Sequence, residues 1–380
     1  MTEQEYMSRA ISLARLGEGF AHPNPMVGAV IVKDGHIIGE GYHKKRGCPH
    51  AERNAIAALS ESARGATMYV TLEPCAHYGK TPPCTEAIIE QGIAKVVIGS
   101  SDPNPKVAGK GVAALRLAGI EVVEGFMREE CDALNPVFFH YITTKTPYVI
   151  LKTAQTLDGK IATKTGASKW ITGEEARQEV QYLRFACMAI MVGIGTVLAD
   201  DPLLTCRLPG GKNPLRVICD SSLRVPLSSR IVQTAGEVDT LFAFANPIYP
   251  IGPIHLEDIS EGEGGEKMAA LLQAGARLVN LPDGSGKVDL RRLMAFLGQQ
   301  EVDSVLLEGG GSLNEAALKA GIVQEYRLYL APKVFGGAGI SPVRGEGVSL
   351  PEEAYLFSLE EVRRVGEDVL LRYKSRVVPD

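Results

Sequence analysis

Three side chains that can bind a metal ion constrain the fold of this chain more than any other feature of its sequence. His50 begins the run HAERNAIAAL, Cys75 follows the run ATMYVTL, and Cys84 begins the run CTEAIIEQG, with eight residues between the two cysteines. The apolar spacing predicts helices for the first and third runs and a strand for the second. A fold in which these side chains bind one ion must therefore bring two helix starts and one strand end together.

One His and two Cys match the ligands of a catalytic zinc ion, which keeps its fourth position open for water. Zinc lowers the pKa of such a water to about 7, but a further group must still move its protons. Glu52 follows His50 by two residues, as in the H-x-E and P-C-x-x-C pattern of zinc nucleobase deaminases. We therefore expect His50, Cys75 and Cys84 to bind one zinc ion and Glu52 to be the catalytic proton shuttle.

Two structural alternatives remain open at this point. His77 lies between the cysteines and could close a structural zinc site as a fourth ligand, because structural sites are fully coordinated by protein. The region could also be a zinc-stabilised binding module without turnover. The position of Glu52 beside a ligand favours catalysis over both.

Strands alternate with helices along the chain, which predicts an α/β fold in two domains. The polar stretch TTKTP, residues 143–147, marks the expected boundary, so that the domains are residues 1–145 and 146–380. The glycine-rich run EGEGGEK, residues 261–267, is expected to be an exposed loop. Helices are predicted near 3–16, 50–59, 83–92, 174–185, 267–275, 290–297 and 312–321, and strands near 27–33, 36–43, 66–72, 94–100, 148–155, 189–194, 215–220, 240–245, 276–281, 303–309 and 325–332.

Charge and cysteine content exclude several classes of protein. A formal net charge of −5 and a pI of about 5.9 disfavour a nucleic-acid partner. No apolar run is long enough for a membrane span, and the first residues, MTEQEYMSRA, contain no apolar stretch of an export signal. Seven cysteines form a poor disulfide framework, which predicts a reducing, cytoplasmic location. Self-association into a homo-oligomer is compatible with the sequence.

The first half resembles the bifunctional deaminase/reductase family of riboflavin biosynthesis in the motifs HPNPMVGAVIV, GYHKKRGCPHAE, TLEPCAHYGKTPPC and SDPNPKVAGKG, which begin at His22, Gly41, Thr71 and Ser101. The resemblance implies a cytidine-deaminase-like three-layer domain. It also implies hydrolytic deamination of 2,5-diamino-6-(5-phosphoribosylamino)pyrimidin-4-one, a pyrimidine ribosyl phosphate. The implied substrate contacts are Asn24, His43, His77, Lys80 and Asn104. Asn24 and Asn104 each precede proline, so both could instead only initiate turns.

The second half lacks the G-x-G-x-x-G fingerprint of a Rossmann dinucleotide site. The run LEGGGSLNEA at residues 307–316 could bind an anion at a helix start, or could be a simple strand-to-helix turn. Three other segments, KTAQTLDGKIAT, GASKWITG and VGIGTVLADDPLLTCR, resemble the reductase half of the same family.

That second resemblance implies a dihydrofolate-reductase-like α/β fold, NADPH as cofactor, and hydride delivery to the ribose C1 that opens the sugar to a ribityl chain. The implied cofactor contacts are Ala154, Trp170, Thr196, Asp200, Ser221, Gly310, Gly311, Ser312, Leu313 and Asn314. The implied substrate contacts are Ser168, Arg184, Leu204, Arg207 and Glu308. The alternative to this function is a nucleoside or tRNA deaminase with an unrelated appended domain.

Overall fold

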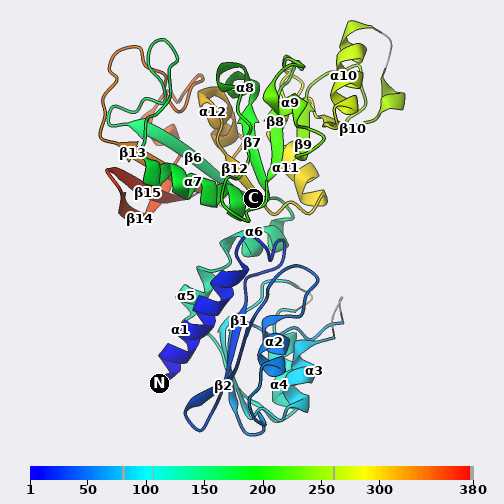
Figure 1. Cartoon of the computed structure of the whole chain (residues 1–380), viewed down its shortest axis with the longest axis vertical. Coiled ribbons are helices and arrows are strands. Elements are labelled where there is room, and N and C mark those ends of the chain that lie inside the picture. The colour runs from blue at the N-terminus through cyan, green and yellow to red at the C-terminus, as the bar shows by residue number, and fades with distance from the viewer. Residues whose placement is uncertain (79–81, 106, 260–261, 377–380) are drawn as a thin grey trace. The chain divides into compact units, whose positions relative to one another are not determined.

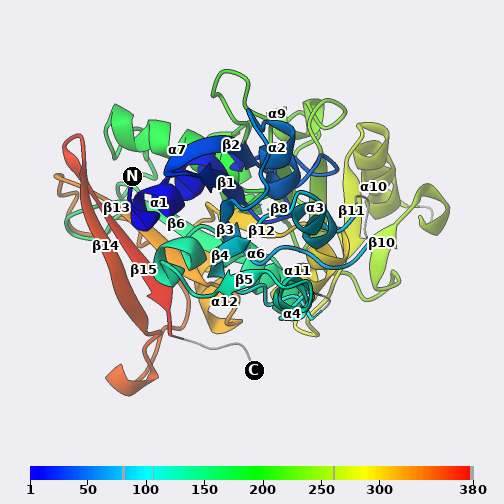
Figure 2. The same cartoon turned by 90° about the horizontal axis from the view of Figure 1, so that it is seen from below.

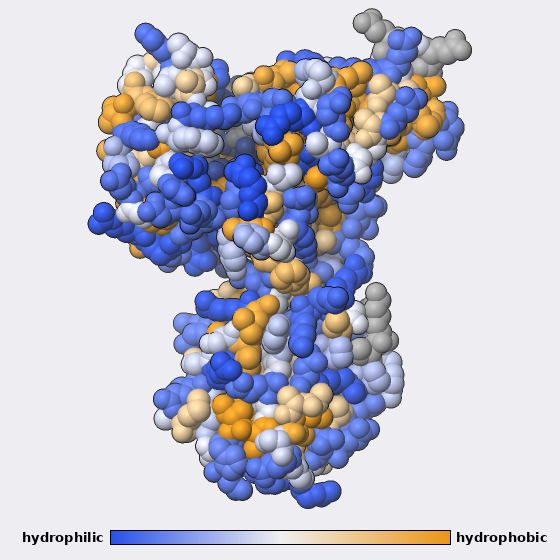
Figure 3. Space-filling view, in the orientation of Figure 1, coloured by the Kyte–Doolittle hydropathy of each residue, from blue (hydrophilic) through white to orange (hydrophobic). Residues whose placement is uncertain are grey.

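The computed structural model describes residues 1–78, 82–105, 107–259 and 262–376. The chain divides into two compact units, Met1–Lys145 and Thr146–Asp380 (Figure 1). None of the helices in the described part of the chain is long and apolar enough to cross a membrane. On the face shown in Figure 3, hydrophobic residues lie scattered among hydrophilic ones.

The first unit contains a five-stranded sheet in the order β2-β1-β3-β4-β5. The strands β1 and β2 form an antiparallel hairpin, and β3, β4 and β5 run parallel to one another. The hairpin turn has Asp34 at φ 48° and Gly35 at φ 80°, the left-handed pair that a tight two-residue turn requires. The strand bounds are β1 Gly28–Lys33, β2 His36–Tyr42, β3 Thr67–Leu72, β4 Lys95–Ser100 and β5 Glu121–Val123.

Helices cover both faces of this sheet and produce three layers (Figure 1). One core cluster joins α1 and the chain near α5 to strand residues such as Val30 and Val97. The other joins α2, α3, α4 and α6 to alternate strand residues such as Ile31 and Val96. This alternation follows from the two-residue period of a strand. The helices are α1 Glu3–Ala14, α2 Ala51–Ala57, α3 Cys84–Glu90, α4 Lys110–Leu117, α5 Arg128–Asp132 and α6 Pro136–Thr144.

The second unit contains a ten-stranded sheet in the order β10-β11-β9-β8-β7-β12-β6-β13-β15-β14. Its centre, from β11 to β13, is parallel, and antiparallel strands lie at both edges, as Figure 2 shows for β10 and β14. The strands are β6 Tyr148–Thr156, β7 Ala189–Gly193, β8 Leu215–Cys219, β9 Thr240–Phe244, β10 Gly252–Ile254, β11 Arg277–Asn280, β12 Ser304–Leu307, β13 Glu325–Ala331, β14 Phe357–Val365 and β15 Asp368–Ser375.

Helices again pack on both faces of the sheet. Helices α11 and α12 pack against one face, and α8, α9 and α10 pack against the other. The parallel strands end at the same edge, where loops after β6, β7, β8 and β12 can build a ligand site. The helices are α7 Glu174–Ala186, α8 Ile194–Asp200, α9 Arg230–Gln233, α10 Glu263–Gln273, α11 Leu290–Gln299 and α12 Gly311–Lys319.

The structure differs from the sequence prediction mainly at elements with weak local signals. The expected loop EGEGGEK is wrong from Glu263 onward, because α10 begins there. Its apolar residues Met268 and Leu271 are buried, so tertiary packing outweighs the low helix propensity of Gly264 and Gly265. The sequence prediction also omitted the helices α4, α5, α6, α8 and α9, the short strands β5 and β10, and the C-terminal hairpin of β14 and β15.

Candidate active sites

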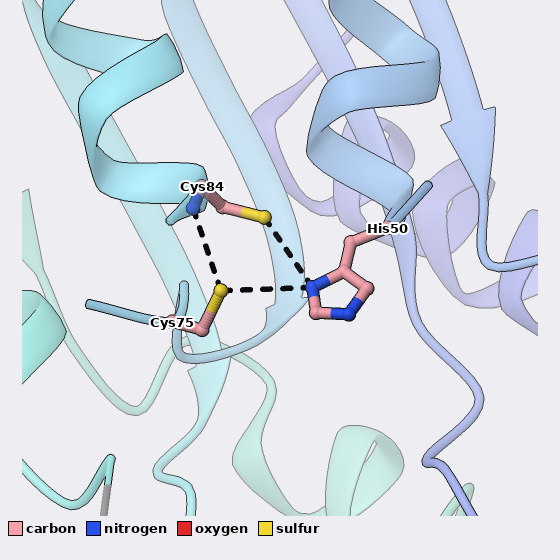
Figure 4. Close-up of side chains that lie close together, drawn as sticks. All are labelled: His50, Cys75 and Cys84. Carbon is pink, nitrogen blue, oxygen red and sulfur yellow. Dashed lines mark hydrogen bonds between the residues drawn. The ribbon is translucent and has the colours of Figure 1, made fainter. Parts of the chain in front are cut away.

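The three predicted metal ligands lie together in the first unit (Figure 4). His50 is the residue before α2, Cys84 is the first residue of α3, and Cys75 follows β3. His50 Nδ1 lies 3.6 Å from Cys75 Sγ and 3.4 Å from Cys84 Sγ. A tetrahedral zinc ion with bonds of about 2.3 Å to sulfur and about 2.0 Å to nitrogen holds these two ligand atoms about 3.5 Å apart. The side chains therefore have the spacing that a zinc ion needs.

Local hydrogen bonds already favour a thiolate at this position. Cys75 Sγ accepts the backbone N–H of Cys84 at the start of α3, at 3.4 Å. Contact with the Cys84 thiol, and then with His50, lowers the pKa of Cys75 to about 4. The same thiol contact, together with burial, raises the pKa of Cys84. One negative charge is thus stabilised before any metal binds, and a cation would favour loss of the second proton.

The cluster supplies three ligands and leaves a fourth position open. Among the described residues, the group that could hold a metal contains His50, Cys75 and Cys84 and does not include His77. His77 is exposed. The geometry therefore does not support the closed structural site with His77 as the fourth ligand.

Glu52 lies in the first turn of α2 with only 3% of its surface exposed. Burial raises the pKa of its carboxyl, although the nearby His50 opposes the shift. A buried carboxyl with a raised pKa holds a proton more readily than an exposed one, which a proton shuttle needs. The helix start thus presents a metal ligand and an acid–base group from the same turn.

Asn24 and His43 form a hydrogen-bonded pair beside this site. His43 Nδ1 lies 3.2 Å from the Pro49 carbonyl, which can only accept, so this nitrogen carries the hydrogen. His43 Nε2, 3.1 Å from Asn24 Nδ2, then accepts from the amide. The His43 ring is 2% exposed and meets the His50 ring edge-on at 5.4 Å. The ring therefore orients the Asn24 amide relative to the metal ligands.

Hydrogen bonds to Glu73, which the sequence prediction missed, connect the loop that carries Asn104 to the loop that carries the metal ligand Cys75. The buried carboxylate of Glu73 accepts backbone N–H groups from Gly109, Gly111 and Val112 at 3.0–3.3 Å. Asn104 itself is half-buried, and its backbone N–H donates to Asp102. The only sequence signal for Glu73 was an acidic residue next to an otherwise apolar strand. Lys80 lies outside the described residues.

In the second unit, most of the predicted contacts line one cavity of about 450 Å³ at the carboxyl ends of β6, β7 and β12. The glycine-rich turn meets the start of α12 here, and Gly310 faces Thr196, whose hydroxyl would be in ordinary van der Waals contact with a β-carbon at this position. Predicted contacts that line the cavity are Ala154, Ser168, Thr196, Asp200, Glu308, Gly310, Gly311, Ser312 and Leu313.

The floor of this cavity holds a charged cluster. Arg184 Nε and Nη2 donate to the two Glu308 carboxylate oxygens at 2.9 and 3.1 Å, and Lys152 Nζ lies 3.6 Å from Glu308. Burial alone raises the pKa of Glu308, but these cations outweigh burial and hold the pKa at about 2. The sequence prediction missed Lys152, although a lysine inside the apolar strand YVILKTAQ was a usable signal.

A second cavity of about 1200 Å³ adjoins the first and shares Gly193, Gly195, Ser312, Leu313 and Arg344 with it. Its lining includes Ser221 and the cations Arg224 and Lys287, together with carboxylates such as Asp283, and cations in a cavity beside a helix start suit the phosphates of a dinucleotide. The residues present therefore fit an extended nicotinamide cofactor.

The remaining predicted reductase contacts are not among the residues that line either cavity. Trp170 and Arg207 are exposed, and Leu204 is buried in a core cluster. Asn314 is also buried, and its side-chain amide donates to the Pro342 carbonyl at 2.8 Å. Arg184 reaches the first cavity through its ion pair with Glu308.

The two units match two families of known domains. Residues 1–100 match the cytidine and deoxycytidylate deaminase zinc-binding region. Residues 147–371 match the RibD C-terminal domain. The fold and the clustered ligands therefore define a zinc-dependent deaminase of the cytidine deaminase type, joined to a reductase with a dihydrofolate-reductase-like fold that uses NAD(P)H.

Similar proteins match along nearly the whole chain. A riboflavin biosynthesis protein RibD of Actinobacillus pleuropneumoniae is 51% identical over 98% of this chain and 95% of that protein. The RibD of Escherichia coli is 42% identical over 98% of this chain and 99% of its own.

Solved structures agree with these relatives. Acinetobacter baumannii RibD superposes with a TM-score of 0.85 at 38% identity, covering 98% of this chain and 99% of that chain. A Thermotoga maritima diaminohydroxyphosphoribosylaminopyrimidine deaminase/5-amino-6-(5-phosphoribosylamino)uracil reductase superposes with a TM-score of 0.83 at 39% identity, covering 98% of both chains. This chain belongs to the RibD family of bifunctional deaminase/reductases of riboflavin biosynthesis. The second unit is thus not an unrelated appended domain.

Proposed function

We propose that the first unit deaminates 2,5-diamino-6-(5-phosphoribosylamino)pyrimidin-4-one and that the second unit reduces the ribosyl chain of the product to ribityl. Family membership supports this choice of pyrimidine substrate, as does the name of the Thermotoga maritima protein. The observation that carries the deaminase assignment is the open three-ligand cluster with the buried Glu52 beside it.

In the deaminase step, the zinc ion held by His50, Cys75 and Cys84 would polarise the attacking water. Glu52 takes a proton from this water as its oxygen bonds to C2 of the pyrimidine. The carboxyl delivers this proton to the ring nitrogen that the attack makes basic, and it then carries the second proton of the oxygen to the departing amino nitrogen, so that ammonia leaves and a carbonyl remains. The raised pKa of Glu52 favours this return of the proton.

Substrate recognition in this unit is assigned to side chains around the cluster. We assign to Asn24 a hydrogen bond to the pyrimidine edge, with its amide oriented by His43. Asn104 and His77 border the same loops, and Lys80 would meet the phosphate as a point charge.

In the reductase step, NADPH when bound would supply the hydride that adds to C1 of the ribosyl group. The C1–O4 bond of the sugar breaks, and O4 needs a proton. We assign this proton donor to Lys152, because its ammonium lies in the cavity beside Glu308. Arg184 and Arg207 are assigned to the substrate, and the turn from Gly310 to Leu313 is assigned to the cofactor phosphates. Asp200, Ser221 and Asn314 remain assigned to cofactor binding.

A variant and a product assay test these roles together. The Glu52→Gln protein should keep about one zinc per chain, lose deamination by more than about 10³-fold, and still reduce the deaminated ribosyl compound with NADPH. Without NADPH, the wild-type protein should accumulate the deaminated ribosyl product. Full deaminase activity in Glu52→Gln would overturn the assigned mechanism. Ammonia release from cytidine or tRNA but not from the pyrimidine phosphate would overturn the substrate.

We also propose a cytoplasmic location and no nucleic-acid partner. None of the seven cysteines, each in the described part of the chain, forms a disulfide, which suits a reducing compartment. A homo-oligomer is part of this proposal, and sedimentation of the full chain would test it.

A further inference from the structure

The single tryptophan of the chain is exposed but held in place. Trp170 has 61% of its surface exposed. Its neighbours Ser168 and Ile171 line the 450 Å³ cavity of the second unit, so the chain at Trp170 runs along the rim of that cavity. An exposed large aromatic side chain beside a cavity is typical of a ligand contact.

Contacts from separate elements fix the segment around this tryptophan. The guanidinium of Arg177 on α7 lies over the indole, 4.8 Å from the ring centroid. Arg177 Nη1 also donates to the Thr172 carbonyl at 2.8 Å. Lys333 Nζ donates to the Trp170 carbonyl, likewise at 2.8 Å, and the Gly173 N–H donates to Asp368. The backbone is thus held at three positions, while the ring itself is held by Arg177.

Helix α7 links this rim to the floor of the cavity. Arg177 and Arg184 are seven residues apart, two helical turns, so both side chains leave the same side of α7. Arg184 forms the buried ion pair with Glu308, and Val180 and Leu183 between them are buried. The helix is therefore a rigid support, and a guanidinium placed from it can hold an indole plane in one orientation.

We propose that Arg177 is a positioning residue of the reductase, which holds Trp170 as an aromatic platform for the planar rings of the nicotinamide cofactor. This inference rests on the proposed function of the second unit. The guanidinium covers one face of the indole, so the other face is available to the cofactor. Arginine suits this role because its planar group stacks on the ring while its N–H groups hydrogen-bond in the same plane. A lysine could keep the charge but not both contacts.

The test compares Arg177→Gln and Arg177→Lys with Gln178→Ala, a control at the next, exposed position of α7. Because the chain has one tryptophan, fluorescence anisotropy decay of the full-length protein without cofactor reports the motion of Trp170 alone. We expect the amplitude of the fast motion of Trp170 to be larger in both Arg177 variants than in wild type. The increase should be greater in Arg177→Gln than in Arg177→Lys, and Gln178→Ala should show no increase. The KM for NADPH should rise about fivefold in Arg177→Gln, with kcat within about twofold and deamination unchanged.

Either of two results for Arg177→Gln would overturn the inference: unchanged Trp170 motion, or equal loss of kcat and kcat/KM with no change in KM. Failure of the proposed function itself gives a different result. In that case wild-type Trp170 emission is not quenched by added NADPH, and no reduction occurs in any variant. A Trp170→Phe protein supplies the background for the quenching measurement. Its own KM should equal or exceed that of Arg177→Gln, and a wild-type KM would also overturn the platform role.

Discussion

Glu308 shows how one buried carboxylate can organise a site. Its side chain is 13% exposed and contacts the cations Arg184 and Lys152. Removing one member of such a cluster leaves the others buried without compensation, which costs about 3–5 kcal/mol. We therefore expect Glu308→Gln to lower the free energy of unfolding of the second unit by about 3 kcal/mol and to abolish reduction. Chemical denaturation followed by far-UV circular dichroism measures the first effect, and deaminase activity is the internal control.

The same residue predicts a pH dependence of stability. The folded-state pKa of Glu308 is lowered to about 2, below the ordinary value of about 4.5. A carboxyl group whose pKa is lower in the folded protein stabilises the fold at pH values above its unfolded-state pKa. This contribution is lost as the pH falls through the folded-state pKa. The melting temperatures of wild type and Glu308→Gln should therefore differ most above pH 5 and converge between about pH 4.5 and pH 2. A constant difference over that range would contradict the ionised assignment.

At the residue scale, the sequence contained the groups that perform chemistry but not the groups that position them. His50, Glu52, Cys75 and Cys84 could be predicted because metal and acid–base chemistry restricts both residue type and spacing. Glu73 and Lys152 each stood out as a charge in or next to an apolar strand, but their roles could not be assigned, because those roles depend on partners that are remote in sequence. Arg177 belongs to this second group, since nothing local links it to Trp170.

At the element scale, helix α4 depends on a close approach of two backbones. A β-carbon on Gly111 would lie 2.0 Å from the Pro74 carbonyl, so the helix start and the metal-ligand loop would have to separate. We expect Gly111→Ala to destabilise the first unit by more than about 2 kcal/mol and to reduce deamination far more than reduction. Calorimetry and the two activity assays check this.

Gly264→Ala on α10 is the matched control for that substitution. A β-carbon there meets nothing within 4 Å, and alanine favours the helix by up to about 1 kcal/mol. Equal loss of both activities in Gly111→Ala would contradict a local effect on the deaminase site.

The elements that could be predicted are those whose apolar residues are mostly buried, because burial requires a recognisable apolar pattern in the sequence. The central parallel strands β7 and β9 are nearly continuous apolar runs, and their existence follows from sequence alone. The final hairpin could not be predicted in this way, because in β14 pairs of charged residues separate apolar ones such as the exposed Leu359 and Val362, so the two-residue period of a strand is absent. Helix α4 begins in a glycine-rich stretch whose helical state depends on the Glu73 carboxylate.

At the scale of the whole molecule, each of the core clusters described above draws its residues from one unit. The metal ligands all belong to the first unit, whereas the cavities with the predicted cofactor contacts belong to the second. Metal binding stabilises only the state that holds the ligands together, so its free energy contributes to folding of the first unit. The two activities should therefore differ in their dependence on metal.

Removal of zinc by a chelator tests this separation in the intact protein. We expect deamination to be lost, two additional thiols, Cys75 and Cys84, to become reactive toward a thiol reagent, and the calorimetric transition of the first unit to move to lower temperature. Reduction of the deaminated substrate and the transition of the second unit should not change, and added zinc should restore the starting state. The Glu52→Gln protein is the matched control, because it lacks deamination but keeps its ligands, so its reactive thiols should increase only after chelation. A parallel loss of reduction would show that the metal stabilises both units, contrary to the separate cores.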